Sequence, residues 1–123
     1  MLLVEDHDST ARVLTRQLAR LQCEVTAVAS LAEASDLLTE SSFDLMVCDL
    51  TMPDGSAVEF VRRVSAQRSM AGRKVVPSIA LRGYSAAEDD VRAVKAAGFV
   101  DQLVKPVDLN ALATAIGRIT GRR

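Results

Sequence analysis

Four charged residues stand directly after short apolar runs of the chain, and their types suit phosphoryl chemistry. They are Glu5, Asp6, Asp49 and Lys105. If the three carboxylates meet, each close pair repels by about 4 kcal/mol at an effective dielectric of roughly 20, so the group needs a cation. Hard oxygen ligands suit Mg²⁺, which binds one or two carboxylates and keeps positions for phosphate oxygens. Asp49 could then attack phosphorus as a nucleophile while Lys105 neutralises the transferring group.

The apolar runs before these residues are typical of strands buried on both faces of a parallel sheet. Residues 45–48 show no polar alternation. Pro53 and Gly55 cannot continue a strand, so we expect residues 51–55 to form a loop. An isolated Asp49 at this point is most often a turn residue. Only further charged residues at the same sheet edge favour a chemical role for it.

Five predicted strands alternate with five predicted helices. The strands are residues 1–4, 24–29, 45–48, 78–81 and 99–104. The helices are expected after Ser9, after Ser30 with Glu33, over residues 56–67, after Ser85 with Glu88, and after Asp108. Residues 68–77, which include Arg68, are predicted to be a solvated loop. Parallel strands need crossovers, so this order predicts an α/β fold, a three-layer doubly wound (βα)5 domain with the strand ends along one edge.

The composition indicates a single intracellular domain. With 123 residues and 49% hydrophobic content, residues 1–123 can bury one core. A formal charge of -1, 3% aromatic residues and no Trp argue against binding to nucleic acid. Cys23 and Cys48 lie in apolar stretches, as is typical of a reduced cytoplasmic protein. No apolar run is long enough for insertion into a membrane.

Three separated motifs make the chain resemble the response-regulator receiver domains of two-component and phosphorelay signalling. They are Leu3-Val4-Glu5-Asp6, Asp49-Leu50-Thr51-Met52-Pro53-Asp54-Gly55, and Gly98-Phe99 leading to Leu103-Val104-Lys105-Pro106-Val107. The resemblance covers essentially the whole chain and implies a flavodoxin-like sheet with the strand order 2-1-3-4-5. It also implies a cis peptide bond at Lys105-Pro106, and a phosphohistidine donor on a histidine kinase or a histidine phosphotransfer protein.

The resemblance also implies a role for each charged residue of the predicted site. Asp49 is the expected phosphoacceptor, and Lys105 is expected to contact the phosphoryl group. Asp6 and Asp49 are expected to bind Mg²⁺ together with the backbone carbonyl of Thr51. Glu5 is expected to hold a metal-bound water.

Two residues depart from the pattern of these receiver domains. Arg82 stands where a Thr or Ser usually follows the phosphoryl group with its hydroxyl, and Gln102 stands where an aromatic residue usually swings inward. We hypothesise that Arg82 reaches the phosphoryl oxygens, or pairs with Asp49 when the site is empty, because a guanidinium matches both oxyanions. The alternative is an Arg82 side chain turned out into solvent.

Three classes of function are compatible with these residues. A phosphorylated signalling receiver, which is not itself an enzyme, fits best. A receiver-like binding module that takes no phosphate stays open because of Arg82 and Gln102. An aspartate-nucleophile phosphohydrolase is the third class, although many of those enzymes have an acid two residues after the nucleophile, where this chain has Thr51. We expect His7 to be an exposed loop residue rather than a ligand or phosphodonor, and Cys48 to pack inside.

The length of the chain suggests a part of a larger protein. The first strand begins at Met1 with almost no lead-in, and no DNA-binding or catalytic output region follows the receiver-like residues. We expect the receiver of a hybrid histidine kinase, and a stand-alone regulator is the alternative.

Overall fold

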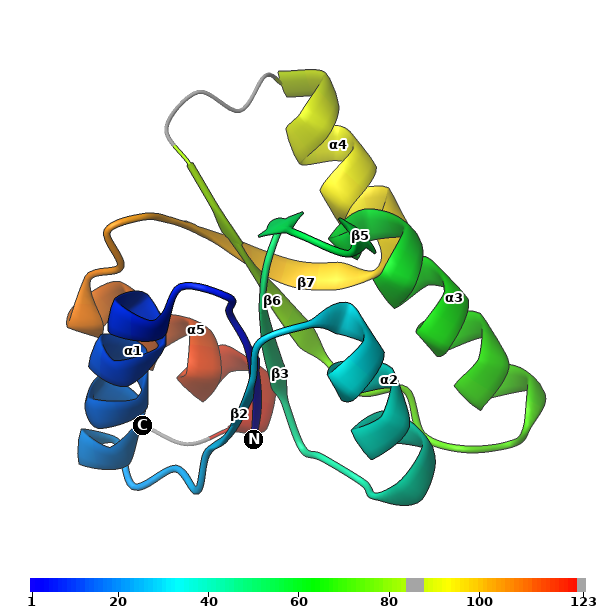
Figure 1. Cartoon of the computed structure of the whole chain (residues 1–123), viewed down its shortest axis with the longest axis horizontal. Helices are drawn as coiled ribbons and strands as arrows, with labels where there is room; N and C mark the ends of the chain where they lie inside the picture. The colour runs from blue at the N-terminus through cyan, green and yellow to red at the C-terminus, as the bar shows by residue number, and fades with distance from the viewer. Residues whose placement is uncertain (84–87, 122–123) are drawn as a thin grey trace.

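The chain forms a parallel sheet covered by helices on both faces (Figure 1). The computed structural model describes residues 1–83 and 88–121, and the side chains of these residues except those of 88–91. In this described part, the five-stranded sheet has the order β2-β1-β3-β6-β7. The strands are β1 (Leu2–Val4), β2 (Thr26–Val28), β3 (Met46–Asp49), β6 (Ser78–Arg82) and β7 (Phe99–Val104). All four neighbouring pairs are parallel, which confirms the predicted doubly wound fold and its strand order.

The segment after Asp49 differs from its prediction. Residues 51–55 were expected to be a loop, but they lie in a small antiparallel hairpin of β4 (Thr51–Met52) and β5 (Gly55–Ser56). Pro53 and Asp54 make the turn, and Gly55 adopts a φ of 148°, which residues with a side chain rarely adopt. The hairpin connects the end of β3 to the next helix.

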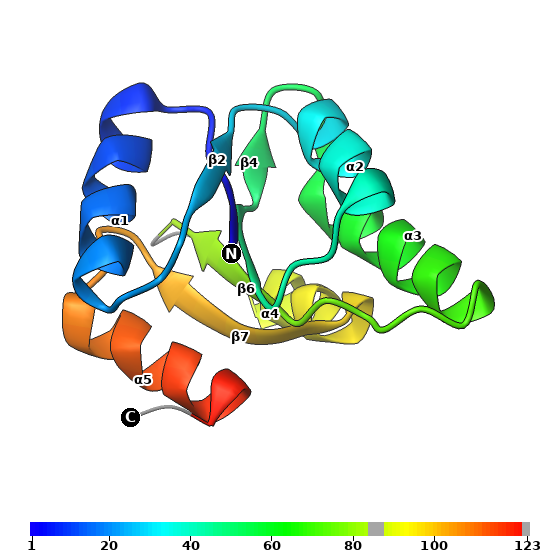
Figure 2. The same ribbon diagram turned by 90° about the horizontal axis from the view of Figure 1, so that it is seen from below.

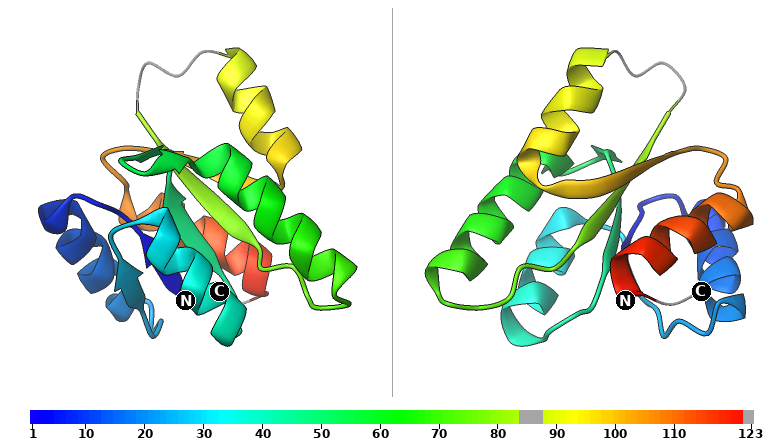
Figure 3. Two further views of the ribbon diagram at one scale, coloured as in Figure 1. Left: turned by 45° about the vertical axis from the view of Figure 1, so that its right-hand side comes forward. Right: turned by 180° about the vertical axis from the view of Figure 1, so that it is seen from behind.

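Alternate residues of each strand face different helices. The helices are α1 (Asp8–Arg20), α2 (Leu31–Glu40), α3 (Ala57–Met70), α4 (Glu88–Ala97) and α5 (Leu109–Thr120). Leu3 and Val47 pack in one core with residues of α1 and α5, whereas Met46 and Cys48 pack in a second core with α2, α3 and α4. Figure 2 shows α1 and α5 on one side of the sheet and α2 and α3 on the other, and Figure 3 shows α3 and α4 as neighbours. Cys48 is thus buried, as predicted.

Side-chain caps start three of the helices at the predicted places. Ser30 accepts a hydrogen bond from the Glu33 amide, Ser56 accepts from the Glu59 amide, and Asp108 accepts from the Ala111 amide. The prediction for Ser9 is wrong, because α1 already begins at Asp8 with His7 at the cap position. An acidic residue in the first turn suits the helix dipole, which explains the earlier start. The predicted cap at Ser85 lies outside the described residues.

The connection after α3 also differs from its prediction. Helix α3 continues to Met70, and Arg68 is only 6% exposed instead of solvated. Its guanidinium donates hydrogen bonds to the backbone carbonyls of Leu38, at 2.8 Å, and Lys74, at 2.7 Å. No helix in the described ranges is long and apolar enough to cross a membrane.

Candidate functional site

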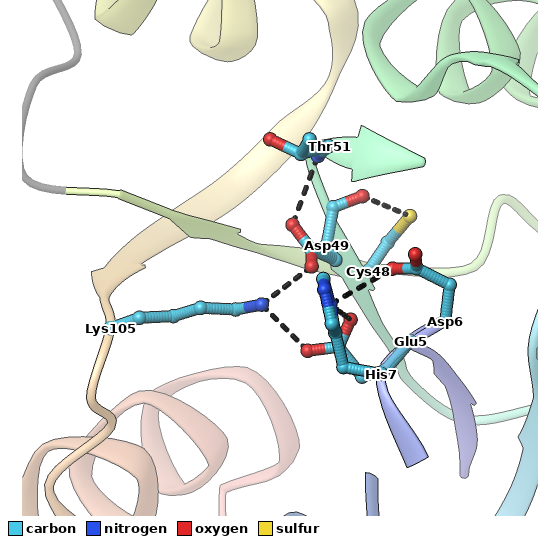
Figure 4. Close-up of polar contacts among 7 residues, drawn as sticks. All are labelled: Glu5, Asp6, His7, Cys48, Asp49, Thr51 and Lys105. Atoms are coloured by element: carbon cyan, nitrogen blue, oxygen red, sulfur yellow. Dashed lines mark hydrogen bonds and ion pairs between the residues drawn. The ribbon is translucent and has the colours of Figure 1, made fainter. Parts of the chain in front are cut away.

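The charged residues that follow the strands gather at the carboxyl edge of the sheet (Figure 4). Val4 pairs with Cys48 in the register of β1 and β3, so Glu5 and Asp49 follow at equivalent positions in the two neighbouring strands. On the other side, Arg82 pairs with Val104, and the Lys105 amide donates to the Arg82 carbonyl at 2.8 Å. Parallel pairing therefore brings together residues that are far apart in the sequence.

Lys105 joins the two buried carboxylates of the site. Its Nζ lies 2.5 Å from Asp49 Oδ2 and 2.6 Å from Glu5 Oε1. The Thr51 amide donates a hydrogen bond to Asp49 Oδ1 at 2.9 Å. The side chains of Glu5 and Asp49 are 0% and 4% exposed, whereas that of Lys105 is 26% exposed. A single partly accessible ammonium group thus contacts two carboxylates that water reaches poorly, and it balances the charge of only one of them.

Burial and these contacts set the charges of the site. Burial raises the pKa of Glu5 to about 7, and the Asp49 carboxylate adds to this effect while Lys105 opposes it. Burial also works against ionisation of Asp49, but hydrogen bonds with Glu5, Lys105 and Thr51 outweigh it and lower the pKa of Asp49. The pKa of Lys105 is raised, because its contacts with Asp49 and Glu5 exceed the cost of burial. Asp49 is therefore an anion beside a cation at neutral pH.

The carboxylate oxygens that Lys105 does not contact define an acidic pocket. Glu5 Oε2 and Asp6 Oδ1 are buried, and neither forms a hydrogen bond with any described residue. Buried acceptors without donors are costly, and a hard divalent cation is the partner that such oxygens suit. The set of Glu5, Asp6 and Asp49 therefore fits Mg²⁺ in donor type and position, and the binding of the ion stays a prediction.

His7 lies closer to this pocket than the sequence indicated. Its side chain is 66% exposed, as expected, but its Nδ1 lies 3.4 Å from Asp6 Oδ1 and 3.9 Å from Glu5 Oε2. The cap position of α1 holds the imidazole against the acidic pair. The sequence signal was the adjacency of His7 to Glu5 and Asp6, which does not reveal where the ring points.

Arg82 and Gln102 lie in neighbouring strands of the same half of the sheet. Arg82 ends β6, is half-buried, and its Nε is a buried atom that makes no hydrogen bond within the described part of the chain. The ion pairs found for the described residues place Lys105, and not Arg82, on Asp49. Gln102 is half-buried in β7, in register with Ala80. The roles of Arg82 and Gln102 stay predictions.

Sequence reasoning missed the contact that ties the hairpin to α2. Asp54 Oδ1 accepts a hydrogen bond from the Leu31 amide and Asp54 Oδ2 accepts from the Ala32 amide, both at 3.0 Å. These two backbone donors lower the pKa of Asp54. The cap comes from a residue 23 positions away from Leu31, so a search for local capping residues does not find it.

The peptide bond at Lys105-Pro106 is cis, as the resemblance implied. It directly follows the strand that carries Lys105 to the edge of the sheet.

The comparisons with known proteins identify the family. The family model of the response regulator receiver domain matches residues 1–117, and the chain belongs to this family. The response regulator protein PilR of Pseudomonas aeruginosa is 30% identical over 90% of this chain and 24% of its own length. The virulence sensor protein BvgS of Bordetella pertussis is 32% identical over 99% of this chain and 10% of its own length. The chain thus spans only a quarter or less of these relatives.

Solved structures show the same fold. The receiver domain of Ssk1 from Saccharomyces cerevisiae, crystallised with the histidine phosphotransfer protein Ypd1, matches with a TM-score of 0.85 and 25% identity, over 94% of this chain and 84% of that chain. The signal receiver domain of a signal transduction histidine kinase from Syntrophus aciditrophicus matches with a TM-score of 0.83 and 25% identity, over 98% and 88%. Receiver domains of this architecture therefore occur among both regulators and kinases.

Proposed function

We propose that Asp49 accepts a phosphoryl group from a phosphohistidine donor in a Mg²⁺-dependent transfer, and that the chain is a signalling receiver rather than an enzyme. The observation that carries this proposal is the position of Lys105 Nζ, 2.5 Å from Asp49 Oδ2, in a pocket with three carboxylates. A nucleophilic carboxylate, a cation beside it and an acidic pocket are what phosphoryl transfer to an aspartate needs.

In the transfer step, an oxygen of Asp49 forms a bond to phosphorus while the bond between phosphorus and the donor histidine nitrogen breaks. The leaving imidazole keeps the electron pair and takes up a proton. The lowered pKa of Asp49 keeps its carboxylate ionised and ready for attack. Asp6, Asp49 and the Thr51 carbonyl would hold a Mg²⁺ ion, and Glu5 would hold a water of that ion. The ion would supply positive charge that offsets the charge of the transferring group.

Lys105 and Thr51 each contact a different oxygen of Asp49. The Thr51 amide holds Oδ1, and Lys105 holds Oδ2. Because Lys105 also contacts Glu5 at 2.6 Å, its ammonium keeps one partner when it moves from Asp49 to a phosphoryl oxygen. The buried carboxylate of Glu5 then keeps its cationic partner during the transfer.

Arg82 is part of the same proposal. Its guanidinium reaches the phosphoryl oxygens on Asp49, in place of the hydroxyl that most receivers have there. The support is a buried Nε without an acceptor among the described residues, on the strand beside β3. A phosphoryl oxygen is an acceptor that a guanidinium binds strongly. Gln102 replaces the usual aromatic residue, so the response to phosphorylation differs from the common switch.

The proposed phosphodonor is a histidine kinase or a histidine phosphotransfer protein. The Ssk1 receiver domain, whose crystal structure contains such a transfer protein, supports this. The similarity to BvgS and to the receiver of a signal transduction histidine kinase supports a place within a hybrid kinase, with a stand-alone regulator as the alternative. The proposed location is the cytoplasm.

The test is phosphorylation by a small phosphodonor in the presence of Mg²⁺, followed by the mass of the intact protein. We expect one phosphoryl adduct on the parent chain and none on Asp49→Asn. The matched control is Asp44→Asn, because Asp44 is an exposed residue just before the opposite end of the same strand. It should keep the adduct.

Two other outcomes would contradict the proposal. Consumption of the phosphodonor without an adduct would indicate a phosphohydrolase, and no reaction at all would indicate a binding module. Arg82→Thr and Arg82→Ala test the role of Arg82, because unchanged rates of phosphorylation and dephosphorylation in both variants would remove it.

A further inference from the structure

The only histidine of the chain faces the acidic pocket. One donor atom from each of Glu5, Asp6, His7 and Asp49 lies within 4.8 Å of the other three. Figure 4 shows the His7 ring directed toward the carboxylates of Glu5 and Asp6. The imidazole is therefore placed to add a nitrogen ligand to a pocket that otherwise offers oxygens.

The oxygens nearest His7, Glu5 Oε2 and Asp6 Oδ1, accept no hydrogen bond from the other described residues. Lys105 contacts Glu5 through Oε1, whereas Oε2 accepts no hydrogen bond from a described residue. The side chain of Glu5 is 0% exposed, so bulk water is a poor substitute. Asp6 Oδ1 is likewise buried without a hydrogen bond from the described residues. These two oxygens and the ring nitrogen form a set of three donor atoms beside the Lys105 contact.

The spacing of this set suits a single small cation. Two ligands of one Zn²⁺ ion lie no more than about 4.2 Å apart, because each is about 2.1 Å from the metal. His7 Nδ1 is 3.4 Å from Asp6 Oδ1 and 3.9 Å from Glu5 Oε2, and both distances meet this limit. One ligand atom from each residue of the cluster lies within 4.8 Å of the others, so small side-chain shifts would let the two carboxylates and the imidazole share one ion.

The donor types decide which ions this set prefers. Carboxylates suit Mg²⁺ and Mn²⁺, whereas imidazole suits Zn²⁺, Ni²⁺ and Cu²⁺. We propose that Glu5, Asp6 and His7 form a binding site for borderline divalent transition-metal ions, represented by Zn²⁺, which competes with Mg²⁺ for the acidic pocket.

Competition has a direct consequence for the proposed transfer. An ion bound by Glu5, Asp6 and His7 occupies carboxylates that Mg²⁺ needs, and it leaves Asp49 paired with Lys105. The inference thus rests on the pocket of the proposed function, but it does not require that Asp49 be phosphorylated. We expect Zn²⁺ to raise the Mg²⁺ concentration needed for phosphorylation in the parent and to have a smaller effect in His7→Gln.

The primary test is calorimetric titration of the tag-free, unphosphorylated chain with Zn²⁺ and, separately, with Mg²⁺. His7→Gln keeps a polar side chain, and His7 makes no capping hydrogen bond in the described structure, so the variant should fold normally. We expect its affinity for Zn²⁺ to fall about tenfold or more, the range for altered metal sites. Its affinity for Mg²⁺ should change by less than about twofold, because imidazole adds little to that ion.

A second readout and a cysteine control complete the test. Because the chain has one histidine, the ring nitrogen resonances of His7 can be observed without ambiguity, and we expect them to shift when Zn²⁺ binds. Cys23→Ser should bind Zn²⁺ as the parent does, and Cys48 is fully buried in the core. Equal Zn²⁺ affinity in His7→Gln and the parent, or unmoved His7 resonances at saturating Zn²⁺, would overturn the inference. Neither result depends on whether Asp49 accepts phosphate.

Discussion

Lys105 and Arg68 are both partly or largely withdrawn from water, and they have different kinds of partner. Lys105 contacts the carboxylates of Asp49 and Glu5 at the carboxyl edge of the sheet. Arg68 lies near the other end of the molecule and donates to the backbone carbonyls of Leu38 and Lys74. Lys105 thus contacts carboxylate side chains, whereas Arg68 contacts backbone carbonyls.

The two side chains also differ in how they can move. Lys105 is 26% exposed and carries a single ammonium on a flexible stem, so it can follow an incoming anion. Arg68 is only 6% exposed, and its planar guanidinium forms hydrogen bonds with both the end of α2 and the segment after α3. Burial, with the nearby charge of Arg73, lowers the pKa of Arg68, but a guanidinium stays protonated in proteins. We therefore expect the more exposed Lys105 to act in the proposed transfer and the buried Arg68 to stabilise the fold.

The largest effect that separates the two cations is expected for phosphorylation. Lys105→Met should slow the phosphorylation of Asp49 by about 100-fold, the loss seen when one donor to a developing charge is removed. The measurement is the rate of adduct formation with a small phosphodonor and Mg²⁺. Arg68→Met, assayed below its melting temperature, should stay within about twofold of the parent. Equal losses in both variants would end the distinction between the cations.

The second prediction concerns stability. Arg68→Met leaves the buried carbonyl of Leu38 and the part-buried carbonyl of Lys74 without this donor, so the free energy of unfolding should fall by about 2–4 kcal/mol. Urea denaturation measures this change. Arg73→Met is the matched control, because Arg73 is exposed and donates only a long 3.4 Å bond to the Thr39 carbonyl. It should cost less than about 0.5 kcal/mol. A loss that small in Arg68→Met would show that Arg68 is not a structural clamp.

The third prediction is a pH dependence of stability that arises at the Lys105 site. Burial raises the pKa of Glu5 from 4.5 to about 7, so between these values the folded state binds more protons than the unfolded state. Stability contributed by protonated Glu5 is therefore full below pH 4.5 and is lost as the pH rises toward 7. The pKa of Asp49 is lowered from 3.8 and that of Lys105 is raised from 10.5. Both shifts therefore affect stability outside the range between pH 4.5 and 7.

Melting temperatures in Mg²⁺-free buffer test whether stability falls as the pH rises. The parent should melt at a lower temperature near pH 7.5 than near pH 5, and Glu5→Gln should lose most of that difference. Arg68→Met should keep the difference although its melting temperatures are lower throughout, because an arginine does not titrate in this range. A parent chain that gains stability between pH 5 and 7.5 would contradict the raised pKa of Glu5.

Local patterns in the sequence were sufficient for the sheet and for the candidate site. Apolar runs that end in Glu5, Asp49 and Lys105 predicted both the strands and their charged ends, because parallel sheets align the carboxyl ends of their strands at one edge. The Ser30 cap was equally local, since capping depends on a residue three positions away. The hairpin was missed because its strands are only two residues each and carry no periodic signal.

Contacts between distant segments were decided only by the tertiary structure. Arg68 was predicted to be solvated, but it packs against α2 and the segment after α3. Asp54 stood in a predicted loop, and only the structure shows that it accepts hydrogen bonds from the first amides of α2. The direction of the His7 ring depends on where α1 begins. Sequence patterns specify which elements form and where they end, because those properties are local. Which donor meets which acceptor depends on how the finished elements pack, and no local pattern encodes that.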